Sequence, residues 1–149
     1  MKKYVGFLFA LVILCQPIQA DAHERQCPPP IEVTQTEADE LLRIAWCEAG
    51  NQGVDGQLYV MSCVINRVND PAFPDSIHDV IFQSGQFATS GMSKASPTWE
   101  THYALAMLEM GNLTPQIIAF ERKENSDLDV YFSKAFDYKD HSFYTTKIN

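Results

Sequence analysis

Apolar residues between positions 36 and 50 recur at spacings of three and four, which is the period that lines up one face of an α-helix. Leu41, Ile44 and Ala45 share that face, and Glu48 falls on it as well. We expect a helix from Thr36, which with Asp39 resembles an N-terminal cap, to Gly50. Burial of Glu48 would raise its pKa and let it act as an acid; alternatively, it turns into solvent at the helix end.

The segments that follow alternate between helical patterns and loops. Residues 54–68 are apolar around nearly the whole helical circumference, so this helix is expected to be central. A short helix is predicted over 77–82, and the Gly- and Ser-rich stretch 84–96 is expected to be a surface loop of the kind that often lines a site. A further helix should begin at Pro97 and end near Gly111.

The C-terminal third changes character. Residues 117–120, 130–133 and 142–145 are rich in residues that favour β-strands. The pattern therefore predicts an α+β fold that is mainly α, with a helical core and a small C-terminal β element.

The N-terminus has the pattern of an export signal. Lys2 and Lys3 precede the apolar run 5–14, and small residues follow near Ala22. This is typical of a secretory signal peptide, and the run is too short for a permanent membrane span. We predict a signal peptide over 1–22, a Pro-rich linker over 23–35 and a catalytic domain over 36–149. Such a protein would work in the periplasm, the cell wall or the extracellular space.

Charge and residue spacing exclude several classes of partner. The 149-residue chain has a net charge of −8, and removal of residues 1–22 takes away Lys2, Lys3 and Asp21. This acidity argues against nucleic acid, which is bound through basic residues. The four histidines are scattered, and no cysteine pair has the spacing of a zinc site. We expect no metal and no cofactor.

Three cysteines remain after the signal peptide. Cys47 and Cys63 fall on neighbouring predicted helices, so they could form one disulfide, or they could be two small buried thiols. Cys27 falls in the predicted linker. The pairing among the three stays open.

Several short motifs together resemble a known family. They are Glu48-Ala49-Gly50, then 56–68 with its Asn66-Arg67, then Phe73-Pro74, then 80–87, and more loosely Tyr131-Phe132 and 141–144. In this order and spacing, the chain is similar to the SleB-type, spore-cortex-lytic cell wall hydrolase catalytic domain over about residues 36–146. The resemblance implies a lysozyme-like or lytic-transglycosylase-like fold and cleavage of the muramic acid to glucosamine β-1,4 bond of peptidoglycan glycan strands. The family's catalytic glutamate maps onto Glu48.

The sequence offers one clear candidate for the catalytic acid that would cleave a glycosidic bond. Ordinary glycosidases use two carboxylates, but only Glu48 is well placed by its pattern. Asp55 suits the start of a helix, and Glu100 and Glu109 are expected to face solvent. A single acid suffices if the muramic C6 hydroxyl is the nucleophile, as in lytic transglycosylases. We therefore favour transglycosylation; hydrolysis stays open if another acid enters the cleft.

Sugar binding calls for amide groups and for apolar or aromatic faces against the ring. The candidates for substrate binding are Gln83, Gln86, Phe87, Tyr131 and His141. For Phe87 and Tyr131, packing in the core is the stronger alternative. Asn66 and Arg67 are expected to end the second helix structurally and receive no catalytic role.

Two other functions remain alternatives. One is a peptidoglycan endopeptidase with Cys47 as nucleophile and His141 as base, although the neighbouring Glu48 would raise the thiol pKa. The other is a peptidoglycan-binding or assembly module without turnover. The sequence does not indicate the oligomeric state, the preferred glycan modification, or a role in sporulation, wall remodelling or secretion.

Overall fold

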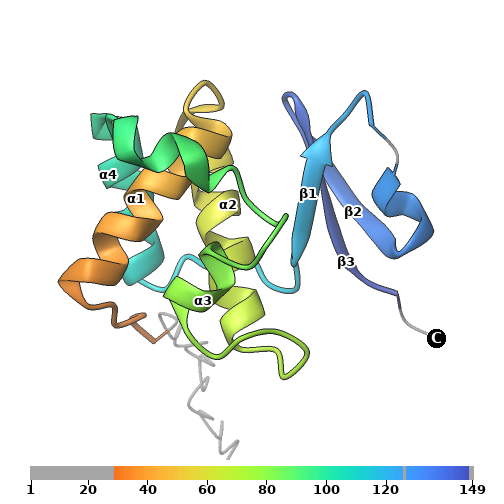
Figure 1. Ribbon diagram of the computed structural model, residues 1–149, viewed down its shortest axis with the longest axis horizontal. Helices are drawn as coiled ribbons and strands as arrows, with labels where there is room; N and C mark the ends of the chain where they lie inside the picture. Colours follow the sequence, from red (N-terminus) through yellow and green to blue (C-terminus); the bar gives the residue numbers. More distant parts are fainter. Residues whose placement is uncertain (1–28, 126, 148–149) are drawn as a thin grey trace, which may run out of the picture.

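The computed structural model describes residues 29–125 and 127–147, and within them a helical part stands beside a three-stranded sheet (Figure 1). The predicted signal peptide and residues 23–28 of the predicted linker, Cys27 among them, lie outside the described residues. The elements in chain order are α1 (Gln35–Ala49), α2 (Gly53–Val68), α3 (Ile77–Ile81), the 3₁₀-helix η1 (Thr89–Lys94), α4 (Trp99–Glu109), β1 (Ala119–Arg122), the 3₁₀-helix η2 (Asp127–Val130), β2 (Phe132–Tyr138) and β3 (His141–Thr146). The prediction of a mainly helical α+β fold is confirmed.

Helix α1 begins one residue before the predicted start and has a different cap. Thr34 is the N-cap: its hydroxyl accepts a hydrogen bond from the backbone N–H of Glu37, and the Glu37 carboxylate accepts one from the N–H of Thr34 at 2.8 Å. The predicted cap Thr36 is wrong. The acid three residues beyond Thr36 is Asp39, which instead pairs with Arg43 at 2.7 Å on the exposed face. The longer glutamate side chain completes the reciprocal capping box at Thr34.

The chain immediately before α1 packs on the helical part. Ile31 donates its backbone N–H to the carbonyl of Glu109 at the end of α4, at 3.0 Å. Ile31 and Val33 are partly buried against the hydrophobic core. These contacts attach residues 31–33 to the folded domain.

Helix α2 is central, as its all-round apolar pattern predicts. It packs against α1, α3 and α4, and Val60, Met61 and Val64 are completely buried. On another side, Tyr59 makes edge-on ring contacts with three aromatic residues of the sheet, Phe136, Tyr138 and Phe143. Helix α2 thus connects the helical core with the sheet.

The sheet is antiparallel, with the strand order β1-β3-β2. Its β1 edge faces the helices in Figure 1. Two predicted strands are displaced: residues 117 and 118 are buried before β1 begins, and Val130 and Tyr131 are exposed, with Val130 ending η2. The alternation of side chains along a strand determines which residues can face a core, but not where the strand begins or ends. The local pattern therefore did not predict the strand ends.

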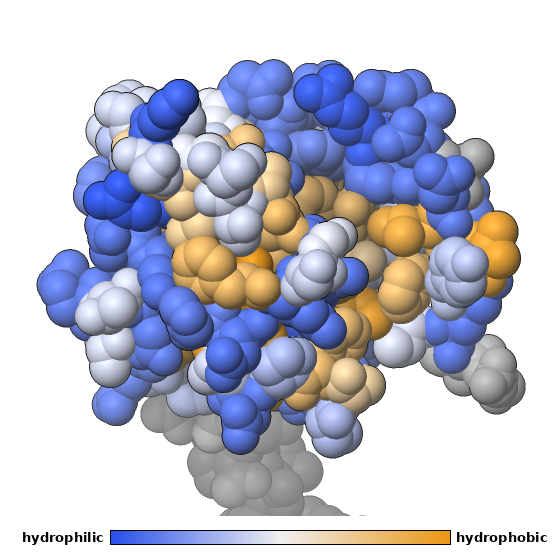
Figure 2. All heavy atoms as spheres, viewed as in Figure 1, coloured by the Kyte–Doolittle hydropathy of each residue, from blue (hydrophilic) through white to orange (hydrophobic). Residues whose placement is uncertain are grey.

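On the face seen in Figure 2, hydrophilic side chains cover most of the margin, and hydrophobic ones gather toward the middle and at the right-hand edge. In the part of the chain that the structure describes, no helix combines the length and the apolar character needed to cross a membrane.

Candidate active site

Glu48 lies in the last turn of α1 and is partly buried. One carboxylate oxygen, Oε1, accepts a hydrogen bond from the backbone N–H of Ala88 at 2.6 Å. Burial raises the pKa of Glu48, and the Ala88 hydrogen bond, which stabilises the ionised form, opposes that rise. The structure therefore places here a carboxylic acid whose proton is held more tightly than in water.

A cavity of about 370 Å³ opens at Glu48. It lies between the α1–α2 turn, the loop after α3 and the sheet, which meet at this point. Its lining is predominantly polar: Cys47, Glu48, Asn51, Gln52, Gln86, Ala88, Phe120, Glu121, Arg122, Asp140 and His141. Amide, carboxylate and imidazole groups around one aromatic ring are suited to a hydroxyl-rich ligand.

Two acidic residues besides Glu48, Glu121 and Asp140, line this cavity, so the hydrolysis alternative, which needs another acid in the cleft, stays open. Glu121 of β1 accepts hydrogen bonds from the Tyr144 hydroxyl at 2.7 Å and from the Leu128 backbone at 3.3 Å. Asp140 accepts one from the Gln52 side chain at 2.9 Å. The sequence pattern did not reveal them, because both lie in the C-terminal β part and reach the cavity only through the sheet's position.

Gln52 joins the α1–α2 turn to the β2–β3 hairpin. Only 2% of its surface is exposed. Its Nε2 donates to the Asp140 carboxylate, its Oε1 accepts from the Asp140 backbone at 3.2 Å, and its own carbonyl accepts from Lys139 Nζ at 2.6 Å. Asp140 is followed directly by His141, so Gln52 holds the hairpin end that carries His141.

His141 is the first residue of β3 and is 7% exposed. Its ring lies 5.4 Å from the Phe120 ring, and its Nδ1 is buried without a hydrogen-bond partner among the described residues. Burial lowers the pKa of His141, with the charge of Asp140 opposing the shift. Burial therefore favours the neutral form of this imidazole at the edge of the cavity.

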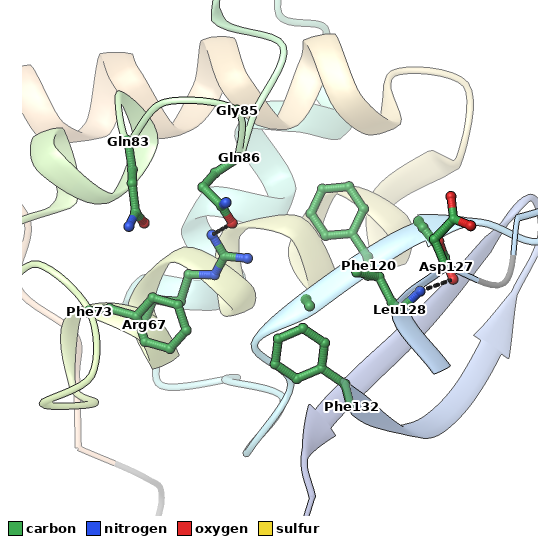
Figure 3. Close-up of a pocket in the computed structure, with 11 residues that line it drawn as sticks. Arg67, Phe73, Gln83, Gly85, Gln86, Phe120, Asp127, Leu128 and Phe132 are labelled. Atoms are coloured by element: carbon green, nitrogen blue, oxygen red, sulfur yellow. Dashed lines mark hydrogen bonds between the residues drawn. The ribbon is translucent and has the colours of Figure 1, made fainter. Parts of the chain in front are cut away.

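A second cavity, of about 470 Å³, adjoins the first (Figure 3). Gln86, Phe120 and Glu121 line both. Arg67 of α2 lies in this second cavity, 6% exposed, and donates to the Ile118 carbonyl at 2.6 Å and to Gln86 Oε1 at 3.1 Å. Its guanidinium also lies over the rings of Phe73 and Phe87.

The structure brings only part of the predicted site together. Glu48, Gln86 and His141 line the first cavity, and Gln83 lines the second. Phe87 lines neither and packs against the hydrophobic core. Tyr131 is 72% exposed and also lies outside both cavities.

Several residues of the cavity were missed by the sequence interpretation: Asn51, Gln52, Phe120, Glu121, Arg122 and Asp140. Gln52 shows why they were missed. A polar residue between Asn51 and Gly53 looks like an ordinary turn residue in the sequence, and only its burial in the structure marks it as a structural partner.

The two described cysteines are not bonded to each other. Cys63 is fully buried, which raises its pKa to about 12. Cys47 lines the cavity together with His141, but burial and the charge of Glu48 both raise its pKa. A thiol that resists ionisation is a poor nucleophile, which disfavours the peptidase alternative. Among residues 29–125 and 127–147, no group of three histidine, cysteine or acidic side chains could hold a metal ion.

Solved structures share this fold. The structure resembles the crystal structure of the catalytic domain of the Bacillus cereus SleB protein, with a TM-score of 0.67 and 18% sequence identity over 78% of this chain and 95% of the other. It also resembles the catalytic domain of the germination-specific lytic transglycosylase SleB from Bacillus anthracis, with a TM-score of 0.67 and 17% identity over 78% and 99% of the two chains. The fold is thus the lysozyme-like α+β fold of SleB catalytic domains, as predicted.

The family follows from the sequence match. Residues 51–145, more than half of the chain, match the model of the Cell Wall Hydrolase family. The chain belongs to this family and is a cell wall hydrolase. The match begins three residues after Glu48, inside the cavity-forming turn. None of the curated proteins matches the sequence.

Proposed function

We propose that this protein is an exported lytic transglycosylase that cuts the β-1,4 bond between N-acetylmuramic acid and N-acetylglucosamine in peptidoglycan, with Glu48 as its acid and base. The observation that carries the proposal is the partly buried Glu48, with a raised pKa, on the wall of a polar cavity in a cell wall hydrolase. The similarity in fold to the Bacillus anthracis lytic transglycosylase supports the choice of reaction.

The proposed reaction needs one proton donor. Protonated Glu48 gives its proton to the glycosidic oxygen as the bond from the muramic C1 to that oxygen breaks, leaving an oxocarbenium-like centre. The Glu48 carboxylate then takes the proton of the muramic C6 hydroxyl, whose oxygen bonds to C1. The products are a 1,6-anhydromuramic end and a free glucosamine hydroxyl, and Glu48 is protonated again.

The surroundings of Glu48 fit both halves of this cycle. Burial favours the protonated acid before cleavage, and the Ala88 N–H stabilises the carboxylate that cleavage leaves. Glu121 and Asp140 also accept hydrogen bonds from protein donors, Tyr144 and Gln52. Glu48 is assigned as the acid because burial raises its pKa and so favours the proton that it gives to the glycosidic oxygen.

Substrate contacts are proposed for the polar groups that share the cavities. Gln86 and His141 lie with Glu48 and would bind sugar hydroxyl and acetamido groups, and Gln83 would act further along the strand. The apolar ring face is supplied by Phe120, which lines both cavities. Phe87 would act indirectly, through its packing against Arg67.

Mass spectrometry of digested peptidoglycan tests the proposal. The wild-type protein should release muropeptides with anhydromuramic ends, and Glu48→Gln should reduce the rate by about 10²–10⁴-fold, the usual contribution of a general acid. Glu109→Gln, at an exposed glutamate outside both cavities, is the matched control and should cleave normally. Undiminished glycan cleavage by Glu48→Gln would refute the assignment.

Hydrolysis is the second candidate, because Glu121 lines the same cavity as Glu48. In that reaction Glu121 would activate a water molecule, and the product would carry a reducing muramic end. Product analysis of wild type and Glu121→Gln separates the two. Reducing ends that disappear with Glu121→Gln would favour the hydrolase, whereas anhydro ends retained in Glu121→Gln would favour the transglycosylase.

Export is part of the proposal because peptidoglycan lies outside the cytoplasmic membrane. The pattern of residues 1–22 supports it. N-terminal sequencing of the protein recovered from outside the cytoplasm should find a chain that starts near residue 23. A chain that keeps Met1 and stays in the cytoplasm would contradict export.

A further inference from the structure

Arg67 is a buried cation with no acidic partner in the described part of the chain. It forms none of the ion pairs found there, and only its Nε and Nη1 have protein acceptors. A guanidinium carries additional N–H donors. Since Arg67 lines the second cavity, those donors are available to a ligand in it. A buried guanidinium gains most from a carboxylate, which it can bind with two parallel hydrogen bonds.

The opposite side of the same cavity is acidic. Asp127 of η2 and Glu121 of β1 line it, and Figure 3 shows Asp127 across the cavity from Arg67. Asp127 makes no side-chain hydrogen bond or ion pair with the described residues, and only one oxygen of Glu121 accepts protein hydrogen bonds. A simple anion would meet repulsion from these two acids, whereas a ligand with a second, positive end would not.

The surface between the two charged ends is apolar. Phe120, Leu128 and Phe132 form it, and Figure 3 places Phe120 and Phe132 between Arg67 and Asp127. An aliphatic chain carrying a carboxylate at one end and an ammonium group at the other matches this order of cation, apolar surface and acid. A sugar ring, which is neutral and hydroxyl-rich, matches it less well.

The second cavity adjoins the first, because both are lined by Gln86, Phe120 and Glu121. We propose that it binds the diamino acid that ends a stem tripeptide on muramic acid, with its free α-carboxylate at Arg67 and its side-chain ammonium group, at the far end of the aliphatic chain, at Asp127 and Glu121. This inference rests on the proposed function, because it presumes a peptidoglycan strand in the first cavity. It makes the enzyme selective for strands that keep their stem peptides with a free amine.

The test compares four forms of one soluble, uncrosslinked strand preparation: with intact stem tripeptides, with the peptide amines acetylated, with the peptide carboxyls amidated, and with the peptides removed. The carboxyl end is tested on the substrate because Arg67 also bonds to Ile118 and its replacement would disturb the sheet. Amidation should lower kcat/KM about thirtyfold or more, since it removes the charged partner of the buried Arg67. Acetylation should lower kcat/KM about two- to fivefold, the range of an exposed ion pair.

Asp127→Asn supplies the matching change on the protein. Asp127 is exposed, so its loss should not affect folding. The variant should cleave intact strands about two- to fivefold less efficiently, through KM, and should distinguish acetylated from intact strands less well than wild type, because Glu121 remains. The control Asp75→Asn removes the same charge at an exposed residue outside both cavities and should behave as wild type.

Direct binding keeps this inference separate from the catalytic proposal. The free stem tripeptide, which ends in the diamino acid, is titrated into the Glu48→Gln protein and followed by NMR, where Asp127→Asn in the same background should weaken binding. If the tripeptide binds through Asp127 while no form of the strand is cleaved, only the proposed function fails. If wild type cleaves all four strand forms equally and the tripeptide does not bind, the inference is overturned while glycan cleavage stands.

Discussion

The backbone N–H of Ala88 lies 2.6 Å from Oε1 of Glu48, so the loop between α3 and η1 reaches back to the last turn of α1. This hydrogen bond joins residues 40 positions apart in sequence. Its donor belongs to the backbone, so the identity of residue 88 does not reveal it. The contact gives the acid a partner that favours its ionised form while burial favours its protonated form.

Ala88→Pro tests this contact. The backbone of Ala88 has φ −79°, which proline can adopt, so the substitution removes the N–H with little local strain. Losing a donor to the carboxylate should raise the Glu48 pKa further. A general acid works when protonated, so the alkaline limb of kcat/KM should move to higher pH.

Ala88→Gly is the matched control, since it changes the side chain and keeps the N–H. Its pH profile should coincide with that of wild type. An alkaline limb in Ala88→Pro that stays where wild type has it would show that the Ala88 hydrogen bond does not tune the catalytic acid.

Glu48→Gln should stabilise the fold at neutral pH. The folded-state pKa of Glu48 is raised above its unfolded value, so ionisation costs more in the folded protein. Below the unfolded pKa the carboxyl is neutral in both states, and the penalty is absent. As pH rises from there through the folded pKa, wild type loses stability relative to the glutamine variant, and the difference then stays constant.

Thermal unfolding at a series of pH values measures this difference. The Tm advantage of Glu48→Gln should be small at about pH 4 and larger at about pH 7. An advantage of equal size at both pH values would point to a cause other than the buried charge. The gain in stability, set against the expected loss of activity, would mark Glu48 as a residue retained for function.

Gln52→Ala should weaken both stability and activity. It removes the side chain that bridges the α1–α2 turn to Asp140 and leaves polar groups of the hairpin without their partner. Loss of a buried hydrogen-bonding partner costs about 1–3 kcal/mol of unfolding free energy. Because His141 follows Asp140, kcat/KM on peptidoglycan should fall as well.

Urea denaturation and an activity assay measure the two effects together. Gln35→Ala, at an exposed glutamine in the first turn of α1, is the control and should change neither. Normal stability with normal activity in Gln52→Ala would mean that the bridge does not hold the hairpin end in place.

Cys47→Ala should keep the activity within about twofold of wild type, an effect expected of a partly buried residue with no chemical role. The pKa of the Cys47 thiol is raised by burial and by Glu48, so little thiolate is available at neutral pH. Release of glycan fragments and of cut stem peptides should be followed in parallel. Loss of peptide cleavage with Cys47→Ala, but not with Glu48→Gln, would instead restore the endopeptidase hypothesis.

The helical half was predictable because local pattern carries most of its information. Apolar periodicity located α2 and its central position, and Leu41, Ile44 and Ala45 are buried as their shared face requires. Cap position was less certain, because Thr34 and Thr36 are both followed three residues later by an acid. The choice between them depended on which acid was free to fold back.

The sheet was harder to predict, because its strands are short and some of their residues also line the cavity at Glu48. Glu121 looks like an ordinary charged residue of an edge strand, and Asp140 like a turn residue. Antiparallel pairing with β3 places Arg122 opposite His141 and turns this end of the sheet toward Glu48. No local signal in the sequence contains that relation.

The sequence by itself determined that a small helical domain with a C-terminal β element would carry a glutamate on the apolar side of its first helix, because side-chain periodicity is a local property. Only the tertiary structure decided what surrounds that glutamate: the Ala88 N–H, the acids Glu121 and Asp140, and the adjoining cavity with Arg67. These groups come from segments far apart in the chain. Their meeting depends on how α2 packs against the sheet, a long-range arrangement that no short stretch of sequence encodes.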